Sequence, residues 1–189
     1  MAIYSWLITI FWLIFLVYWL VSAMSAKKRM TNSPHARGVG LRIAIFIIIF
    51  LILQLPIFGT FAAYFDTFFT NPLVNILGVI LCGLGVAFAI WARYHLGRNW
   101  GMPMSIQKEA ELVTSGPYAL VRNPIYIGGL LALFGSMLVG GFFWLVFLVV
   151  TGVYFIYSLK VEEKLMEQQF PQTYPKYKKR TKALIPFIF

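Results

Sequence analysis

The sequence predicts an all-α fold, a polytopic membrane helix bundle of about five transmembrane helices with a cytoplasmic C-terminal helical tail. The first observation is composition, because 60% of the 189 residues are hydrophobic and only 12% are charged. So few charges could not cover this much apolar surface in water. The second is that apolar residues fall in runs of about 20, enough for a helix to cross the hydrocarbon. The third is that all 16 lysines and arginines lie at or beyond the ends of these runs.

The predicted spans differ in length and in the prolines and glycines that they contain. The second contains Pro56, whose freed backbone group neighbouring helices can satisfy. The third contains small residues that allow close helix contact, namely Gly78, Gly83 and Gly85. The fourth is short for a full span, and the glycines at 140 and 141 that join it to the fifth predict a tight helical hairpin. The spans cover about residues 3–24, 41–64, 73–91, 124–139 and 142–159.

The charge pattern predicts an orientation. Three basic residues directly follow the first span, the reverse of a cleaved signal peptide, so we expect a retained helix that ends inside. A non-cytoplasmic N-terminus then places all the basic residues in cytoplasmic segments, at 27–42, 93–122 and 160 onward. The C-terminus is cytoplasmic in this arrangement, and the small size favours a bacterial inner membrane over the endoplasmic reticulum. We divide the chain into three N-terminal spans with their loops (1–92) and a catalytic half (93–189).

Composition also excludes several functions. The net charge of +10 would suggest nucleic acid in a soluble protein, but basic residues kept on one side of a membrane produce the same sum. We therefore expect no nucleic-acid partner. Cys82 is the only cysteine and the chain has two histidines, so we expect neither a disulfide framework nor a metal site.

The concentrated polarity lies in two segments that flank the predicted hairpin, 93–126 and 160–182. If the hairpin returns the chain to the same face, these segments become neighbours at the membrane surface. Arg122 and Asn123 precede Pro124, which fixes a first helical turn whose amides could receive an anion. Glu162 and its neighbour Glu163 lie where the last span ends. A carboxylate so close to the hydrocarbon costs free energy unless it is paired, so such a residue often has a function.

The basic tail has a simpler interpretation. Its lysines form the kind of juxtamembrane flank that binds anionic lipid, without any catalytic role. They are Lys176, Lys178, Lys179 and Lys182.

A family resemblance covers about residues 96–186. The stretch Leu112-Val113-Thr114-Ser115-Gly116-Pro117-Tyr118, followed by Val121-Arg122-Asn123-Pro124-Ile125-Tyr126-Ile127-Gly128, resembles the signature of the isoprenylcysteine carboxyl methyltransferases. Leu96-Gly97-Arg98-Asn99-Trp100 is similar to an upstream family motif, and residues after the hairpin, from Glu162 to Pro186, fall at the family's spacing.

The resemblance implies methyl transfer from S-adenosylmethionine to a lipophilic acceptor at the cytoplasmic membrane face. It also implies candidate catalytic roles, with Glu162 attracting the cationic parts of the cofactor and Arg122 holding its carboxylate. Because a sulfonium methyl is already activated, the protein mainly has to align acceptor and donor. The implied cofactor contacts are Gln107, Ala110, Glu111, Leu112, Val113, Tyr118, Asn123, Pro124, Ile125, Tyr126 and Glu162.

Two departures from the family pattern leave the acceptor open. Asn123 stands where the family usually has histidine, and asparagine cannot carry charge or transfer a proton. Ser158 stands where eukaryotic members have an arginine implicated in substrate binding; Lys160 could supply that cation instead. A prenylcysteine-like carboxylate, an amine and a thiol all remain acceptable nucleophiles. The candidate substrate-binding residues are Ser158, Lys160 and Arg180.

Two other functions remain open. Membrane reductases of the sterol and steroid type use NADPH and share a similar hairpin motif and a late arginine-threonine, as in Arg180-Thr181. Their motif continues into glycine-glutamate, whereas this chain has Gly128-Gly129. A non-catalytic lipid-binding membrane protein would bind neither cofactor.

Overall fold

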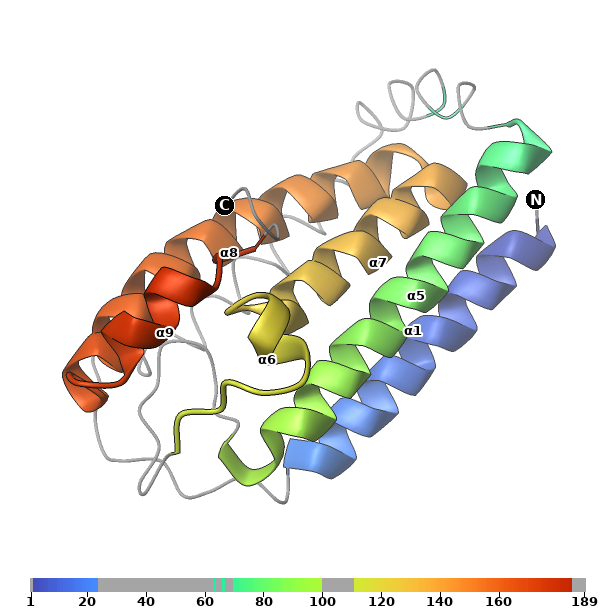
Figure 1. The fold of residues 1–189 in the computed structure, drawn as a ribbon. Helices are drawn as coiled ribbons and strands as arrows, with labels where there is room; N and C mark the ends of the chain where they lie inside the picture. The colour runs from blue at the N-terminus through green and yellow to red at the C-terminus, as the bar shows by residue number, and fades with distance from the viewer. Residues whose placement is uncertain (1, 24–62, 64–65, 67–69, 100–110, 185–189) are drawn as a thin grey trace.

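The computed structural model describes residues 2–23, 63, 66, 70–99 and 111–184. In these ranges the chain is helical, and its only bridge between extended residues is an isolated one. The long helices α1 (Ala2–Ala23), α5 (Pro72–Leu96), α7 (Pro124–Gly140) and α8 (Phe142–Gln169) lie side by side in a bundle (Figure 1). Shorter elements follow α5 and α8: η2 (Gly97–Asn99), α6 (Pro117–Leu120) and α9 (Tyr174–Arg180). The all-α prediction is confirmed.

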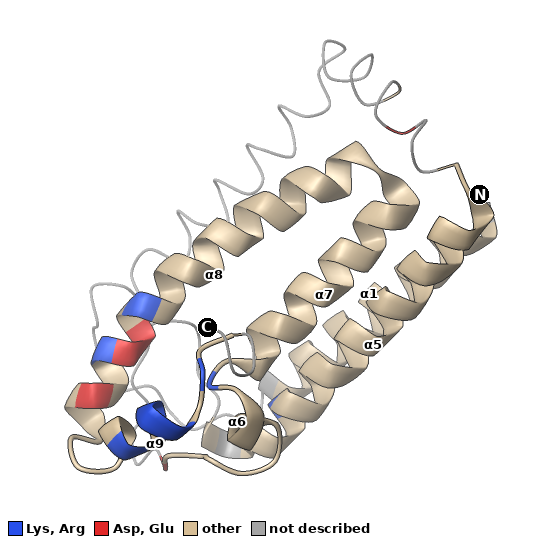
Figure 2. Ribbon diagram, turned by 45° about the horizontal axis from the view of Figure 1, so that its top comes forward, with Lys and Arg blue, Asp and Glu red and all other residues tan. Residues whose placement is uncertain are grey.

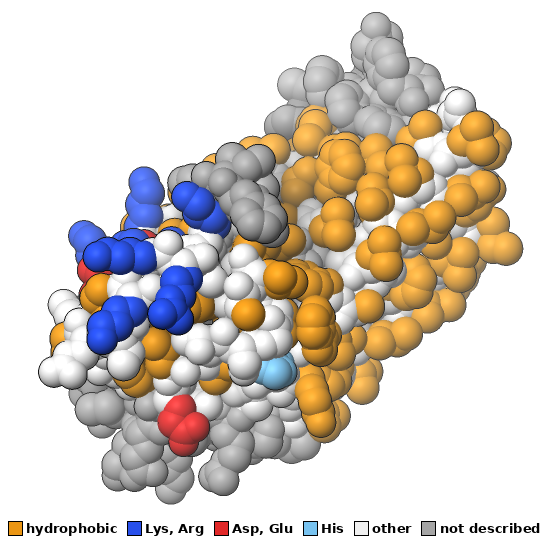
Figure 3. All heavy atoms as spheres, in the orientation of Figure 1, with side chains coloured by type: hydrophobic (Ala, Val, Ile, Leu, Met, Phe, Trp, Pro, Cys, Tyr) orange, Lys and Arg blue, Asp and Glu red, His pale blue; other side chains and the backbone are white. Residues whose placement is uncertain are grey.

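Three of the described helices are long and apolar enough to cross a membrane: Ile3–Ser22 of α1, all of α5 and all of α8. α7 is apolar but shorter, with 17 residues. Apolar side chains cover the face of the bundle seen in Figure 3, while Lys, Arg and Glu of α8 and α9 gather at one end (Figure 2). The protein is therefore an integral membrane protein. Nearly all of the predicted second span, 41–64, lies outside the described residues, and the orientation stays a prediction.

The helices α5 and α7 contact each other directly through their backbones. A Cβ added at Gly128 would lie 2.7 Å from the backbone nitrogen of Ala89 and 2.7 Å from the carbonyl oxygen of Gly85. A Cβ at Gly78 would lie 2.6 Å from the carbonyl oxygen of Gly135. In a membrane such close packing is a main source of helix association. Lipid is as apolar as the side chains, so the hydrophobic effect does not drive helices together there. The expectation for Gly78 and Gly85 is confirmed, whereas Gly83 faces α1.

Substituting Gly128 with alanine is expected to lower the free energy of unfolding by about 1–3 kcal/mol, since the new methyl group would push two backbones apart. Gly129→Ala is the matched control, because its Cβ would make an ordinary 3.5 Å contact with the ring of Phe155. Thermal unfolding of both variants in the same detergent measures the difference. Equal midpoints would mean that α5 and α7 do not meet as described.

The first helix is tied to the bundle by polar contacts. Trp12 donates from Nε1 to the hydroxyl of Ser136 on α7, at 3.0 Å. Arg93, near the end of α5, is 1% exposed and donates to two carbonyl groups, Ser22 at 2.6 Å and Gly97 at 2.7 Å. Cations stabilise helix C-termini, and this one serves the ends of α1 and α5 together.

The predicted hairpin is present. α7 ends at Gly140 and α8 begins at Phe142, and Gly141 between them has a φ of +64°, a conformation that favours glycine. Asp66 accepts a hydrogen bond from the amide of Phe142 at 2.8 Å and so caps the start of α8. The hairpin returns the chain to the end of the bundle at which α7 began. It therefore delivers the Glu162 turn of α8 to the first turn of α7.

Candidate functional site

The C-terminal strap, residues 174–184, lies against the start of α7. Val121 pairs with Lys182 in the isolated parallel bridge, and the amide of Arg122 donates to the carbonyl of Lys182 at 2.8 Å. The amide of Asn123 donates to the carbonyl of Ala183 at 3.1 Å, as does its side-chain nitrogen. Sequence reasoning missed this pairing, which forms one wall of the candidate site.

The start of α6 is attached to the same strap. The Tyr177 hydroxyl donates to the carbonyl of Tyr118 at 2.6 Å, and the hydroxyl of Thr181 donates to the carbonyl of Tyr177. Burial raises the pKa of Tyr177 to about 12, because a phenolate loses its hydration there. The Tyr177 hydroxyl therefore stays protonated at neutral pH and can donate this hydrogen bond.

Behind the strap, Tyr126 of α7 meets Glu162 of α8. The tyrosine hydroxyl donates to Oε1 of Glu162 at 2.6 Å, and the Tyr126 ring stacks on Phe155 with centroids 4.1 Å apart. Leu159, Ala183 and Leu184 are buried against Tyr126. This contact joins a carboxylate to an aromatic wall at the end of the apolar belt.

Two further predicted residues lie near this pair. Tyr118 is 7% exposed; burial raises its pKa, with Tyr177 and Glu162 adding to the rise and Arg93 opposing it. Tyr118 lies in α6, which contacts α5 and α7, and its carbonyl accepts the hydrogen bond from Tyr177 of α9. Ser158 is fully buried one turn before Glu162, and its hydroxyl lies close to that of Tyr126.

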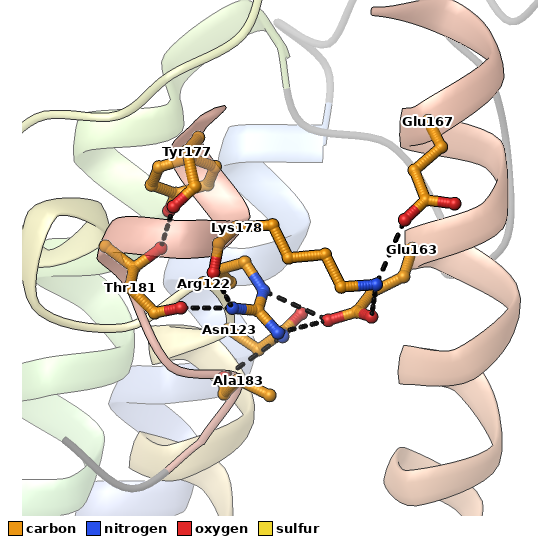
Figure 4. Close-up of polar contacts among 8 residues, drawn as sticks. All are labelled: Arg122, Asn123, Glu163, Glu167, Tyr177, Lys178, Thr181 and Ala183. Carbon is orange, nitrogen blue, oxygen red and sulfur yellow. Dashed lines mark hydrogen bonds and ion pairs between the residues drawn. The ribbon is translucent and has the colours of Figure 1, made fainter. Parts of the chain in front are cut away.

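Arg122 joins three segments rather than facing an open space (Figure 4). Its Nε and Nη2 atoms donate to Oε1 of Glu163 at 3.0 and 2.5 Å. Its Nη1 atom donates to the carbonyl of Lys178 at 3.2 Å and to that of Thr181. The side chains of Arg122 and Glu163 are only 9% and 15% exposed. We call this group of contacts, together with Lys178, the clamp.

Lys178 completes the clamp from the strap. Its ammonium lies 2.7 Å from Oε2 of Glu163 and 3.0 Å from Oε1 of Glu167. Hydrogen bonds to these two carboxylates raise the pKa of Lys178 above its ordinary value. Lys178 therefore keeps its positive charge through neutral pH and loses it only in strongly alkaline solution.

The remaining predicted residues divide into four groups. Pro124 is buried at the start of α7, with Asn123 and Ile125 half-buried beside it. Leu112 and Val113 are half-buried, and the exposed Glu111 donates its amide to the side-chain oxygen of Asn99 at 3.2 Å. Lys160 and Arg180 are exposed, and Lys160 lies two residues from Ser158, which puts it on another face of α8. Gln107 and Ala110 lie outside the described residues.

Known proteins resemble this chain over the same region. Residues 73–173 match the phospholipid methyltransferase family. The cobalt-zinc-cadmium resistance protein CzcN of Cupriavidus metallidurans is 31% identical over 128 residues, 64% of this chain and 53% of that protein. The protein-S-isoprenylcysteine O-methyltransferase of Saccharomyces cerevisiae is 29% identical over 122 residues, 62% of this chain and 51% of that protein. Protein-S-isoprenylcysteine O-methyltransferase B of Arabidopsis thaliana is 29% identical over 119 residues, 61% of this chain and 60% of that protein.

The predicted resemblance to isoprenylcysteine carboxyl methyltransferases is confirmed by these matches. The chain spans about half the length of the first two relatives, 53% and 51%. The matched region contains nearly all of α5, the hairpin and the Glu162 turn, whereas the strap follows it in the sequence.

Proposed function

The chain belongs to the phospholipid methyltransferase family, and from this premise we propose that it transfers a methyl group from S-adenosylmethionine to a lipophilic acceptor. The observation that carries the proposal is the contact between Tyr126 and Glu162, inside the matched region and at the end of the apolar belt. A polar ligand reaches this end from water, and an apolar one reaches it from lipid.

The side chains present suit the cofactor. S-adenosylmethionine supplies a methyl group activated by a positive sulfonium, which leaves the protein the task of alignment. The carboxylate of Glu162 is placed to attract a cation, and Tyr118 and Tyr126 offer aromatic faces and hydroxyls to a nucleoside. The buried hydroxyl of Ser158 is a polar group that a bound molecule can satisfy. The rest of the proposed cofactor site is lined by the first turn of α7 and by Glu111, Leu112, Val113 and Asn123.

The role of Arg122 follows from its contacts. Because its guanidinium is committed to Glu163 and to two strap carbonyls, we assign it the positioning of the Glu162 turn against α7. Holding the carboxylate of the cofactor, the role that the resemblance implied, would require Arg122 to leave these partners.

The acceptor in this proposal is lipid-like and approaches at the cytoplasmic face. Ser158 offers the acceptor a neutral hydroxyl rather than a cation. Lys160 and Arg180 are exposed and serve only an acceptor group that extends beyond the buried side chains around Tyr126. A carboxylate, an amine and a thiol remain candidate nucleophiles, and each must lie in line with the donor methyl group.

Calorimetric titration of the purified full chain tests the proposal. We expect saturable binding of S-adenosylmethionine and none of NADPH. Binding of NADPH alone would instead identify a reductase, and binding of neither would identify a non-catalytic lipid-binding protein. Transfer of labelled methyl groups into a membrane-lipid extract then identifies the acceptor, and a bound cofactor without any labelled lipid would contradict the proposed lipid acceptor.

A further inference from the structure

The strap has two faces of opposite character. Tyr174 and Tyr177 point inward and are 4% and 8% exposed. The cations of the same segment are exposed, and Figure 3 shows basic side chains gathered at this end of the molecule. We call them the outer cations: Lys176, Lys179, Arg180 and Lys182.

The carboxylates nearest to the strap are bound to other partners. Glu163 holds Arg122 and Lys178, and Glu167 holds Lys178. None of the outer cations forms an ion pair with a carboxylate among residues that the structure describes. Lys178 therefore belongs to the clamp although its neighbours in sequence belong to the surface, a distinction that the sequence alone does not make. The outer face is left with four positive charges.

The position of the strap's outer face in the fold indicates which kind of molecule it contacts. The strap follows α8 after a short turn and runs back to the first turn of α7, where Lys182 pairs with Val121. Ala183 and Leu184 are buried directly beside Tyr126. The outer cations thus lie where the apolar belt ends and polar groups begin, which is the level of lipid head groups (Figure 3).

We propose that the outer cations bind the head groups of anionic phospholipids, and that this binding holds the strap against the start of α7. Clusters of lysine and arginine beside a transmembrane helix are attracted to anionic lipid, and phosphate accepts charge-assisted hydrogen bonds from both side chains. The lipid bound here is a structural partner and not the methyl acceptor. Arg180 is the one outer cation that is also a candidate contact for the acceptor, and Lys176, Lys179 and Lys182 have no part in the proposed reaction.

Titration of the full chain in neutral detergent with short-chain phosphatidylglycerol tests this directly. We expect saturable binding that weakens at high salt, and no binding of the matching phosphatidylcholine. The variant that combines Lys176→Gln, Lys179→Gln, Arg180→Gln and Lys182→Gln should bind phosphatidylglycerol at least about tenfold more weakly. Because all four side chains are exposed, its thermal unfolding midpoint should stay that of the wild type. Equal binding by the variant and the wild type would overturn the proposal.

Two further measurements separate this surface from a general anion site. The charge-conserving variant Lys176→Arg, Lys179→Arg, Lys182→Arg should keep the wild-type affinity, and inorganic phosphate should bind far more weakly than the lipid. Hydrogen exchange of residues 174–184 should slow when phosphatidylglycerol is added to phosphatidylcholine nanodiscs, in the wild type but not in the glutamine variant. Unchanged exchange, or inorganic phosphate binding as tight as lipid binding, would contradict a lipid-held strap.

Discussion

Replacing Arg122 with methionine is expected to release the strap and to lower the free energy of unfolding by about 3 kcal/mol. Removing one partner of a largely buried ion pair leaves the other charge poorly compensated, an effect of about 3–5 kcal/mol for fully buried pairs. Because Glu163 would still be paired with Lys178, we expect the loss in free energy of unfolding to lie at the lower end of that range. The carbonyl groups of Lys178 and Thr181 would also lose a donor.

Arg122→Lys separates charge from shape. Lysine keeps the positive charge but replaces a planar fork by a single ammonium, which cannot reach the Glu163 carboxylate and both strap carbonyls together. We expect intermediate stability. Lys164→Met is the matched control, because Lys164 is an exposed cation next to Glu163 on α8. Its effect should stay within about 0.5 kcal/mol.

The measurements are thermal unfolding and the rate of tryptic cleavage within residues 174–184. Arg122→Met should be cut faster than either Arg122→Lys or Lys164→Met, because the strap would open more often. If Arg122→Met were as stable as the control and yet failed to bind S-adenosylmethionine, Arg122 would be a cofactor ligand and the clamp would not be its main role.

Local sequence patterns were sufficient to predict the helices that cross the membrane and the turn between the last two. Run length predicted α1, α5 and α8, and the paired glycines predicted the turn at Gly141. The proximity of Tyr126 and Glu162 followed from the hairpin, since two antiparallel helices of similar apolar length return to one surface.

Contacts that depend on distant segments could not be predicted in this way. Arg93 was counted as one more basic residue beside a span, yet it binds the carbonyl ends of two helices because α1 and α5 finish side by side. Arg122 was expected to face a ligand, but the strap returns across it. Nothing in the spacing of residues 174–184 encodes that return, although the apolar Ala183 and Leu184 after a basic run indicate that the chain goes back to a buried place.

Neutralising Glu162 is expected to weaken binding of S-adenosylmethionine by about tenfold to a hundredfold, because hydrogen bonds and attractions that involve a charged group are worth about 1.5–3 kcal/mol. Glu162→Gln keeps the size of the side chain and can still accept a hydrogen bond from Tyr126. The loss therefore reports on charge rather than on packing. Glu167→Gln, five residues after Glu162 on α8 and 45% exposed, is the control and should bind normally.

The product of the proposed reaction makes the test sharper. S-adenosylhomocysteine has the same nucleoside and amino acid groups but lacks the positive sulfonium. If Glu162 attracts that charge, Glu162→Gln should weaken binding of the donor much more than binding of the product. Equal losses for both ligands would place Glu162 against the nucleoside or the amino group instead.

Tyr126 is expected to act through both its hydroxyl and its ring. Tyr126→Phe removes the 2.6 Å hydrogen bond to Glu162 but keeps the stack on Phe155, so donor affinity should fall only about twofold to tenfold. Tyr126→Ala also removes the aromatic wall and should reduce affinity for donor and product alike. Calorimetry with both ligands measures these effects. Normal binding by both Tyr126→Ala and Glu162→Gln would mean that the cofactor site lies elsewhere, because these two side chains carry the proposed site.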